Sequence, residues 1–124
     1  MDDIQIIELY NERSETAISE TANKYGKYCY YIAYHILYDE QDSEECVNDT
    51  YLRAWESIPP QYPNKMSAFL GKITRNLALN RYRYMSSIQE IANDYEISEG
   101  KVKMTLLRTR NKLKQILEKE GIVL

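Results

Sequence analysis

The chain has 124 residues, 44% of them hydrophobic, and its 16 Lys and Arg against 19 Asp and Glu give a formal net charge of −3. This length fits one domain with at most a small appendage, and no apolar run approaches the ~20 residues of a membrane helix, so we expect no membrane insertion. The acidic N-terminus does not look like a secretory signal, and Cys29 and Cys46 form no CxxC pair, so we expect buried free thiols and a cytoplasmic location.

The sequence predicts an all-α fold, because it has only four glycines and three prolines and no sustained alternating pattern. We expect a short helix around residues 4–10 and long helices at 14–38, 42–57 and 67–84. The buried stripe of the first long helix recurs every three or four residues, at Ile18, Ala22, Tyr25, Cys29, Ile32 and Ile36. Asp42, with Glu45 three residues later, is expected to cap the second long helix. Pro59, Pro60 and Pro63 end that helix and hold a loop through Asn64.

The last part of the chain predicts a helix-turn-helix. Ser87 and Glu90 form a candidate capping box for a short helix over 87–94, a break follows at 95–97, and Ser98 can cap a second helix. The apolar stripe of this second helix is Val102, Leu106, Leu113 and Leu117, and its cations, Lys101, Lys103, Arg108, Arg110, Lys112 and Lys114, lie largely off that stripe. Such a helix can enter a DNA major groove. The alternative is a helical hairpin with a solvated basic face.

Charge is divided unequally along the chain. Residues 1–65 carry five Lys and Arg against thirteen Asp and Glu, whereas residues 66–124 carry eleven against six. The basic half can contact phosphates, while the acidic half would repel them and suits a basic protein surface. We therefore expect two partners of opposite charge.

Three blocks of the sequence, in this order, resemble bacterial sigma factors of the extracytoplasmic-function (ECF) type. Residues 42–55 resemble the helix that binds RNA polymerase, residues 69–83 the helix that melts and reads the −10 promoter element, and residues 87–117 the helix-turn-helix for the −35 element. The resemblance implies a three-helix sigma domain two at 1–84 and a truncated, sigma domain-four-like helix-turn-helix at 85–124.

Acidic side chains on the second long helix are the candidate polymerase contacts. Asp42, Glu45 and Asp49 lie three and four residues apart, so their carboxylates share one helix face, where like charges cost stability unless a basic partner neutralises them. The resemblance implies that this face binds the β′ subunit coiled coil of core RNA polymerase, with Asn48 and Arg53 as further contacts. The alternative is that the acids stabilise the helix dipole, which would not account for Asp49. Trp55, at the end of this helix, is either core or an interface anchor, and we expect core.

Candidate DNA contacts lie on the next helix. Lys72, Arg75, Arg81 and Arg83 can contact phosphates, and Asn76 and Asn80, four residues apart, can hydrogen-bond a base edge or a flipped base. The alternatives are that Asn80 caps or solvates a helix, and that Asn76 pins two helices together. The resemblance also implies capture of an extruded base by the loop at 60–65, and it would place an acidic residue where Asn80 stands.

The helix-turn-helix supplies a second candidate set. Near the start of its second helix, Glu99, Lys101 and Lys103 are expected to face bases, with Met104 as a candidate apolar contact. The capping residue Ser98 is a further candidate DNA contact. Further along, Arg108, Arg110, Lys112 and Lys114 are expected to hold phosphates, which give affinity without sequence information.

One departure from the family concerns the join between its two DNA-binding parts. Only Tyr84, Met85 and Ser86 separate Arg83 from the helix-turn-helix, where the family has several tens of residues. Three residues reach about 10 Å, whereas the family's promoter elements are separated by roughly 17 base pairs, or about 58 Å at 3.4 Å per pair. We therefore expect a sigma-like protein that cannot hold both elements as an intact sigma factor does.

Three functions follow from these features. The first is a sigma-factor-like initiation protein, impaired by the missing linker, that binds core polymerase and promoter DNA, with an anti-sigma factor as a further partner that the resemblance implies. The second is a stand-alone helix-turn-helix regulator, and the third is a helical protein that competes for polymerase or an anti-sigma factor. The single His35 has no partner for a zinc site, and no nucleophile–base set or glycine-rich phosphate loop is visible. We therefore expect neither an enzyme nor a cofactor or metal.

Overall fold

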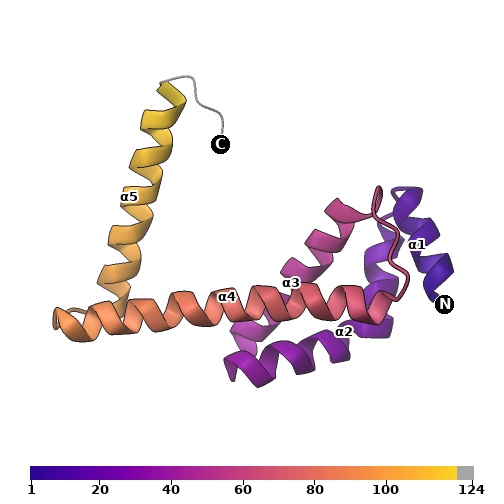
Figure 1. Cartoon of the computed structure of the whole chain (residues 1–124), viewed down its shortest axis with the longest axis horizontal. Helices are drawn as coiled ribbons and strands as arrows, with labels where there is room; N and C mark the ends of the chain where they lie inside the picture. Colours follow the sequence, from indigo (N-terminus) through magenta and orange to yellow (C-terminus); the bar gives the residue numbers. More distant parts are fainter. Residues whose placement is uncertain (120–124) are drawn as a thin grey trace. The chain divides into compact units, whose positions relative to one another are not determined.

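The computed structural model describes residues 1–119, and these residues form five helices and no strand (Figure 1). The helices are α1 (Asp3–Asn11), α2 (Thr16–Leu37), α3 (Glu40–Ser57), α4 (Met66–Asp94) and α5 (Glu99–Lys119). The predicted all-α fold is confirmed. No helix in this part of the chain is both long and apolar enough to cross a membrane.

The chain separates into two compact units, and the division falls within α4, after Tyr82. This is two residues before the boundary expected from the sequence.

The first unit has a core built from α1, α2, α3 and the first part of α4. Helix α1 begins with a capping box between Asp2 and Gln5, and it buries Ile6, Ile7 and Tyr10 completely or nearly so. The Tyr10 hydroxyl lies 2.7 Å from the Thr21 hydroxyl and so joins α1 to α2. The sequence predicted a three-helix bundle, and the structure adds α1 as a full contributor to its core.

On α2, the predicted stripe is only partly the buried face. Cys29 is fully buried, whereas Ile18, Ala22, Tyr25, Ile32 and Ile36 are half-buried. The most buried positions also include the small residues Ala17, Thr21 and Ala33, which let the neighbouring helices approach closely. The predicted stripe therefore lies on the correct side of α2, but it does not include the small residues that are the most deeply buried there.

The start of α3 differs from the prediction. Asp39, not Asp42, is the capping residue, and its carboxylate accepts a hydrogen bond of 2.8 Å from the backbone N–H of Asp42. Because Asp39 has an extended backbone directly before the first helical turn, it occupies the position from which a side chain reaches the orphan N–H groups. Asp42 then lies within the first turn, and its side chain is available for other contacts.

The segment predicted to link the two DNA-binding parts is helical in the structure. No break separates residues 67–84 from 87–94, and Ser87 lies inside α4, where its hydroxyl donates to the backbone carbonyl of Arg83 at 2.9 Å. The proposed capping box of Ser87 and Glu90 is therefore wrong, and Tyr84, Met85 and Ser86 are helical rather than a linker. The segment contains neither Gly nor Pro, so nothing in it terminates the helix.

The second unit contains the end of α4, a turn and α5. The predicted break is confirmed: α4 ends at Asp94, Glu96 has a left-handed backbone with φ of 52°, and the Ser98 hydroxyl accepts a hydrogen bond of 3.1 Å from the N–H of Lys101. A small core forms from Ile88, Ala92 and Val102, with Ile97 packed against it.

Among the described side chains of the predicted stripe of α5, the first is buried and the next two are not. Val102 is buried, whereas Leu106 and Leu113 are exposed, because the end of α4 is long enough to cover only the start of α5. The side chain of Leu117, the last residue of the stripe, lies outside the described part of the structure.

Candidate functional site

The candidate polymerase contacts lie along α3. Glu45, Asn48, Asp49 and Arg53 are exposed, and Asp42 is half-buried. The 18 residues of α3, which follow the Asp39 cap and end at Ser57, hold these side chains on one helix. Exposure of carboxylates on a helix is what docking of a basic protein surface requires.

In the structure, one predicted DNA contact on α4 forms ion pairs with two predicted polymerase contacts on α3. The Arg81 guanidinium on α4 lies 3.4 Å from the Asp42 carboxylate on α3 and makes a second ion pair with Glu45 (both side chains partly exposed). A residue predicted to contact DNA is thus paired with two residues predicted to contact polymerase. Pairing also offsets the repulsion between the two acids, which lie three residues apart on α3.

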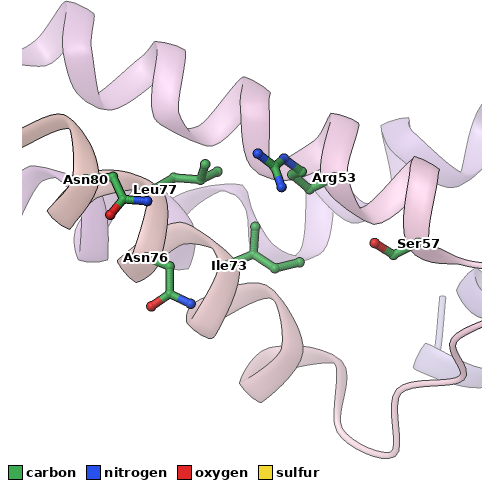
Figure 2. Close-up of a pocket in the computed structure, with 6 residues that line it drawn as sticks. All are labelled: Arg53, Ser57, Ile73, Asn76, Leu77 and Asn80. Carbon is green, nitrogen blue, oxygen red and sulfur yellow. The ribbon is translucent and has the colours of Figure 1, made fainter. Parts of the chain in front are cut away.

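A shallow groove of about 200 Å³ runs between α3 and α4. Figure 2 shows the residues that line it: Arg53, Ser57, Ile73, Asn76, Leu77 and Asn80. Ile73 points from α4 toward α3, whereas the Asn76 amide points away from α3 (Figure 2). Asn76 is also exposed, so its amide has the solvent access that a base contact needs and does not pin the two helices together. The candidate polymerase contact Arg53 therefore shares a groove with both candidate base-reading amides.

A larger groove of about 540 Å³ lies on another side of α4 and carries its phosphate-binding candidates. Tyr28 of α2 forms one wall, and the other lining residues belong to α4: Ala68, Gly71, Lys72, Arg75 and Asn76. Lys72 and Arg75 are exposed and can reach an anionic backbone. Asn76 lines both grooves, so one amide on α4 is accessible from either side.

Gly71 leaves room for the Tyr28 side chain against α4 at the larger groove. A Cβ atom at this position would lie 2.7 Å from the Tyr28 hydroxyl oxygen and 3.4 Å from a methyl carbon of Ile32. The absence of a side chain at Gly71 therefore lets the Tyr28 ring rest against α4, where it borders the cations. An aromatic wall beside cations is a common arrangement for binding single-stranded nucleic acid.

Arg13 is a supporting residue that the sequence did not reveal. Its guanidinium donates to the backbone carbonyls of Trp55 at 2.9 Å and Ile58 at 2.8 Å, and it lies 3.7 Å from the centre of the Trp55 ring. Arg13 thereby satisfies carbonyl groups at the end of α3 and fixes the start of the loop that leads to α4. Trp55 itself packs against the core, as the sequence predicted, and its ring is covered on one side by Arg13.

Two hydroxyl groups hold α3 and α4 together beneath the candidate site. The Thr50 and Thr74 hydroxyl oxygens lie 2.9 Å apart, both fully buried, and each is also 2.9 Å from a carbonyl of its own helix. Because buried polar groups without partners are costly, this pair favours one register of α4 against α3.

The two cysteines are free and buried, as predicted. Burial raises the pKa of the Cys46 thiol to about 11 and also raises the pKa of Cys29. Neither thiol is therefore activated for nucleophilic chemistry. Within residues 1–119, no cluster of His, Cys, Asp and Glu that could hold a metal ion is present.

The second unit presents its own candidate contacts. On α5, Lys101, Lys103, Met104, Arg108, Arg110 and Lys112 are all exposed, as is Lys114. Ser98 and Glu99 lie at the start of the same helix, where the Ser98 hydroxyl already accepts the capping hydrogen bond. Arg83, predicted as a phosphate contact with the first unit's cations, belongs to the second unit.

Comparison with protein families gives one match. The model of the family described as Sigma-70 region 2 matches residues 21–87, just over half of the chain. The match spans α2 from Thr21, all of α3, and α4 as far as Ser87, and it ends before the turn and α5. No match was found among curated proteins or among solved structures.

Proposed function

Because the chain belongs to the Sigma-70 region 2 family, we propose that it is an ECF-type, sigma-factor-like initiation protein that binds core polymerase through α3 and promoter DNA through α4. Proteins of this family bind core RNA polymerase and recognise promoters. They are transcription factors rather than enzymes. We expect this protein to act in the cytoplasm, where polymerase and chromosome meet.

The polymerase side of the proposal rests on the acids of α3. Asp42, Glu45 and Asp49 share one face, and Glu45 and Asp49 are exposed. Asn48 and Arg53, also exposed, extend this surface along the helix. A basic partner such as the β′ coiled coil would neutralise the carboxylates and gain a fast, salt-sensitive association.

The DNA side of the proposal rests on α4. Lys72 and Arg75 lie beside Tyr28 in one groove, and Asn76 and Asn80 line the other. Cations that hold phosphates next to amides that can bond base edges are the arrangement that a promoter-melting helix needs. The loop at 60–65 precedes this helix directly and remains the proposed site for an extruded base. Arg81 and Arg83 remain proposed phosphate contacts.

The observation that carries the proposal is the family match, joined to the difference in charge between α3 and α4, which both lie within it. The test is binding of purified chain to bacterial core polymerase, measured with the Asp49→Lys variant beside the parent. Loss of binding in Asp49→Lys is expected, because a cation at the centre of the acidic face repels a basic partner.

The matched control is Glu44→Lys, which makes the same charge change at an exposed residue on the opposite side of α3. It should keep most of its polymerase binding. Failure of the parent chain to bind core polymerase would refute the proposal. If the parent and both variants instead bind DNA alike and none binds polymerase, the chain is a stand-alone helix-turn-helix regulator.

The helix-turn-helix of the second unit is proposed as a reduced −35 module. Ser98, Glu99, Lys101, Lys103 and Met104 would face bases, and Arg108, Arg110 and Lys112 would hold phosphates. No flexible linker of the family's kind lies between Arg83 and Ser87, because both are within α4. We therefore propose limited initiation, or competition with intact sigma factors, and an anti-sigma factor as a further class of partner.

A further inference from the structure

Four apolar residues of α5, together with Thr109, follow a heptad repeat that continues beyond the small core of the helix-turn-helix. Val102, Leu106, Thr109, Leu113 and Ile116 are spaced by four, three, four and three residues, which is the spacing of alternating d and a positions in a coiled coil. These five residues are called the seam below. A helix with such a seam normally packs it against another helix along its length.

Among the described residues of the second unit, none packs on most of the seam. Val102 is 4% exposed because it packs on Ile88, Ala92 and Ile97. Exposure then rises along the helix to 37% at Leu106, 55% at Leu113 and 48% at Ile116. The covered part therefore ends about one turn into α5.

At its covered end, the seam opens into an apolar groove of about 140 Å³. The groove is lined by Ile91, Ile97, Val102, Thr105 and Leu106. The exposed seam and this groove are continuous through Val102 and Leu106, so a helix laid along α5 could place its end in the groove.

The charges beside the seam decide what kind of helix fits. The positions that flank it carry Lys103, Thr105, Arg110 and Lys112, and residues 100–117 contain six Lys and Arg and no Asp or Glu. Flanking positions of a coiled coil select the partner through charge. A second copy of this chain would bring the same cations and no carboxylate to pair with them. A partner helix with Asp or Glu at its flanking positions could instead pair with Lys103, Arg110 and Lys112.

We propose that the seam of α5 is a docking site for an acidic amphipathic helix of another protein. The partner would place apolar residues against Leu106, Leu113 and Ile116, and Asp or Glu opposite Lys103, Arg110 and Lys112. This proposal does not depend on polymerase binding by α3, because it uses only residues of the second unit. It does use Lys103, Arg110 and Lys112, which are also proposed DNA contacts, so a docked helix and DNA would compete for these cations.

The probe for this site is a synthetic three-heptad peptide with Leu at positions a and d and Glu at e and g. Its binding to the full chain is followed by fluorescence anisotropy at low and at high salt. A second peptide with Lys at e and g is the charge control. The acidic peptide should bind at least about tenfold more tightly than the basic one, and added salt should weaken its binding.

The matched variants are Leu113→Gln, on the seam, and Leu107→Gln, off the seam, since the two leucines are 55% and 49% exposed. Leu113→Gln should weaken peptide binding by about tenfold and Leu107→Gln by less than about twofold, because only the first residue loses an apolar contact with the peptide. Arg110→Glu should weaken binding of the acidic peptide and strengthen binding of the basic peptide. Unfolding of α5 could not produce this gain in binding.

Three results would overturn the proposal. One is equal binding of the two peptides, and another is equal loss in Leu113→Gln and Leu107→Gln. The third is a chain that sediments as a dimer and becomes a monomer in Leu113→Gln, which would assign the seam to a second copy.

Discussion

The Arg81 guanidinium on α4 lies 3.4 Å from the Asp42 carboxylate on α3, and Glu45 pairs with the same guanidinium. The positive charge of Arg81 is therefore already balanced before any nucleic acid arrives. Lys72 and Arg75, by contrast, are exposed beside Tyr28 in the larger groove. The cations of α4 are consequently unequal as candidate phosphate contacts.

This inequality predicts the ranking of alanine variants in DNA binding. Arg75→Ala should lower the slope of log affinity against log salt by about one, as expected for the loss of one phosphate contact. Arg81→Ala should change the slope by clearly less, because binding a phosphate would first require its ion pairs to open. The measurement is a salt titration with single-stranded and duplex DNA. Equal slopes for the two variants would mean that the ion pairs open at no cost.

Arg13 is predicted to stabilise the first unit through the end of α3. Arg13→Ala removes two hydrogen bonds to backbone carbonyls and the contact with the Trp55 ring, so the free energy of unfolding should fall by about 1 to 3 kcal/mol in urea titrations. Arg53→Ala, at an exposed position on α3, is the control and should change stability by less than about 0.5 kcal/mol.

The backbone at Arg13 provides an internal check on this result. Its φ is 57°, in the left-handed region, where glycine is favoured over other residues by about 1 kcal/mol. Arg13→Gly should therefore be more stable than Arg13→Ala by about that amount. If Arg13→Gly were the less stable of the two, the left-handed backbone would not be contributing.

The buried hydroxyl pair of Thr50 and Thr74 is predicted to couple α3 to α4. Replacing either threonine by the isosteric valine leaves the other hydroxyl with only its own helix carbonyl. Each single variant should cost about 1 kcal/mol, and the double variant should cost less than the sum of the two. A double-mutant cycle in urea measures this. Strict additivity would show that the two hydroxyl groups do not depend on each other.

The burial of the Cys46 thiol predicts how the protein responds to alkali and to thiol reagents. Burial raises the pKa of its thiol from about 9 to about 11, so the folded state favours the neutral form. The resulting stability is complete below pH 9 and is lost as the pH rises from 9 toward 11, because the unfolded chain ionises first. Iodoacetamide at pH 8 should label Cys46 slowly in the native chain and rapidly in denaturant. Rapid native labelling would contradict the burial of this thiol.

Much of the fold follows from local signals that the sequence states clearly. The turn at residues 95–97 and the Ser98 cap were predicted correctly, because a Ser directly before an amphipathic segment is a strong signal for the start of a helix. The loop with its three prolines likewise ended α3 near the expected place. The long helices were found from their apolar spacing, and the structure moved their ends by at most two residues, except that α4 continues to Asp94 where an end near Tyr84 was expected.

The errors concern choices between competing local signals. Both Asp39 and Asp42 can cap α3, and the sequence does not say which one has the extended backbone. Ser87 and Glu90 have the spacing of a capping box. They nevertheless lie inside α4, which began at Met66 and continues through them because no nearby residue terminates it. Capping patterns are therefore weak evidence for a helix start when no breaker precedes them.

The candidate site was predicted as residue types rather than as an arrangement. Acidic α3 and basic α4 were recognised from their charges, but the pairing of Arg81 with Asp42 depends on how two distant segments pack. The support that Arg13 gives to Trp55 and Ile58 spans more than forty residues and has no signal in the local sequence. The wall formed by Tyr28 and Gly71 is of the same kind.

The match to the Sigma-70 region 2 family starts at Thr21, yet the core of the first unit includes residues that precede it. Ile6 and Ile7 of α1 are buried, and Tyr10 hydrogen-bonds to Thr21 itself. Each isoleucine returned to water would cost about 2 kcal/mol, a large share of the 5 to 15 kcal/mol that holds a typical domain together. A fragment trimmed to the matched residues 21–87 for crystallisation or NMR would thus be prone to aggregate, and the N-terminal helix should be retained in any such design.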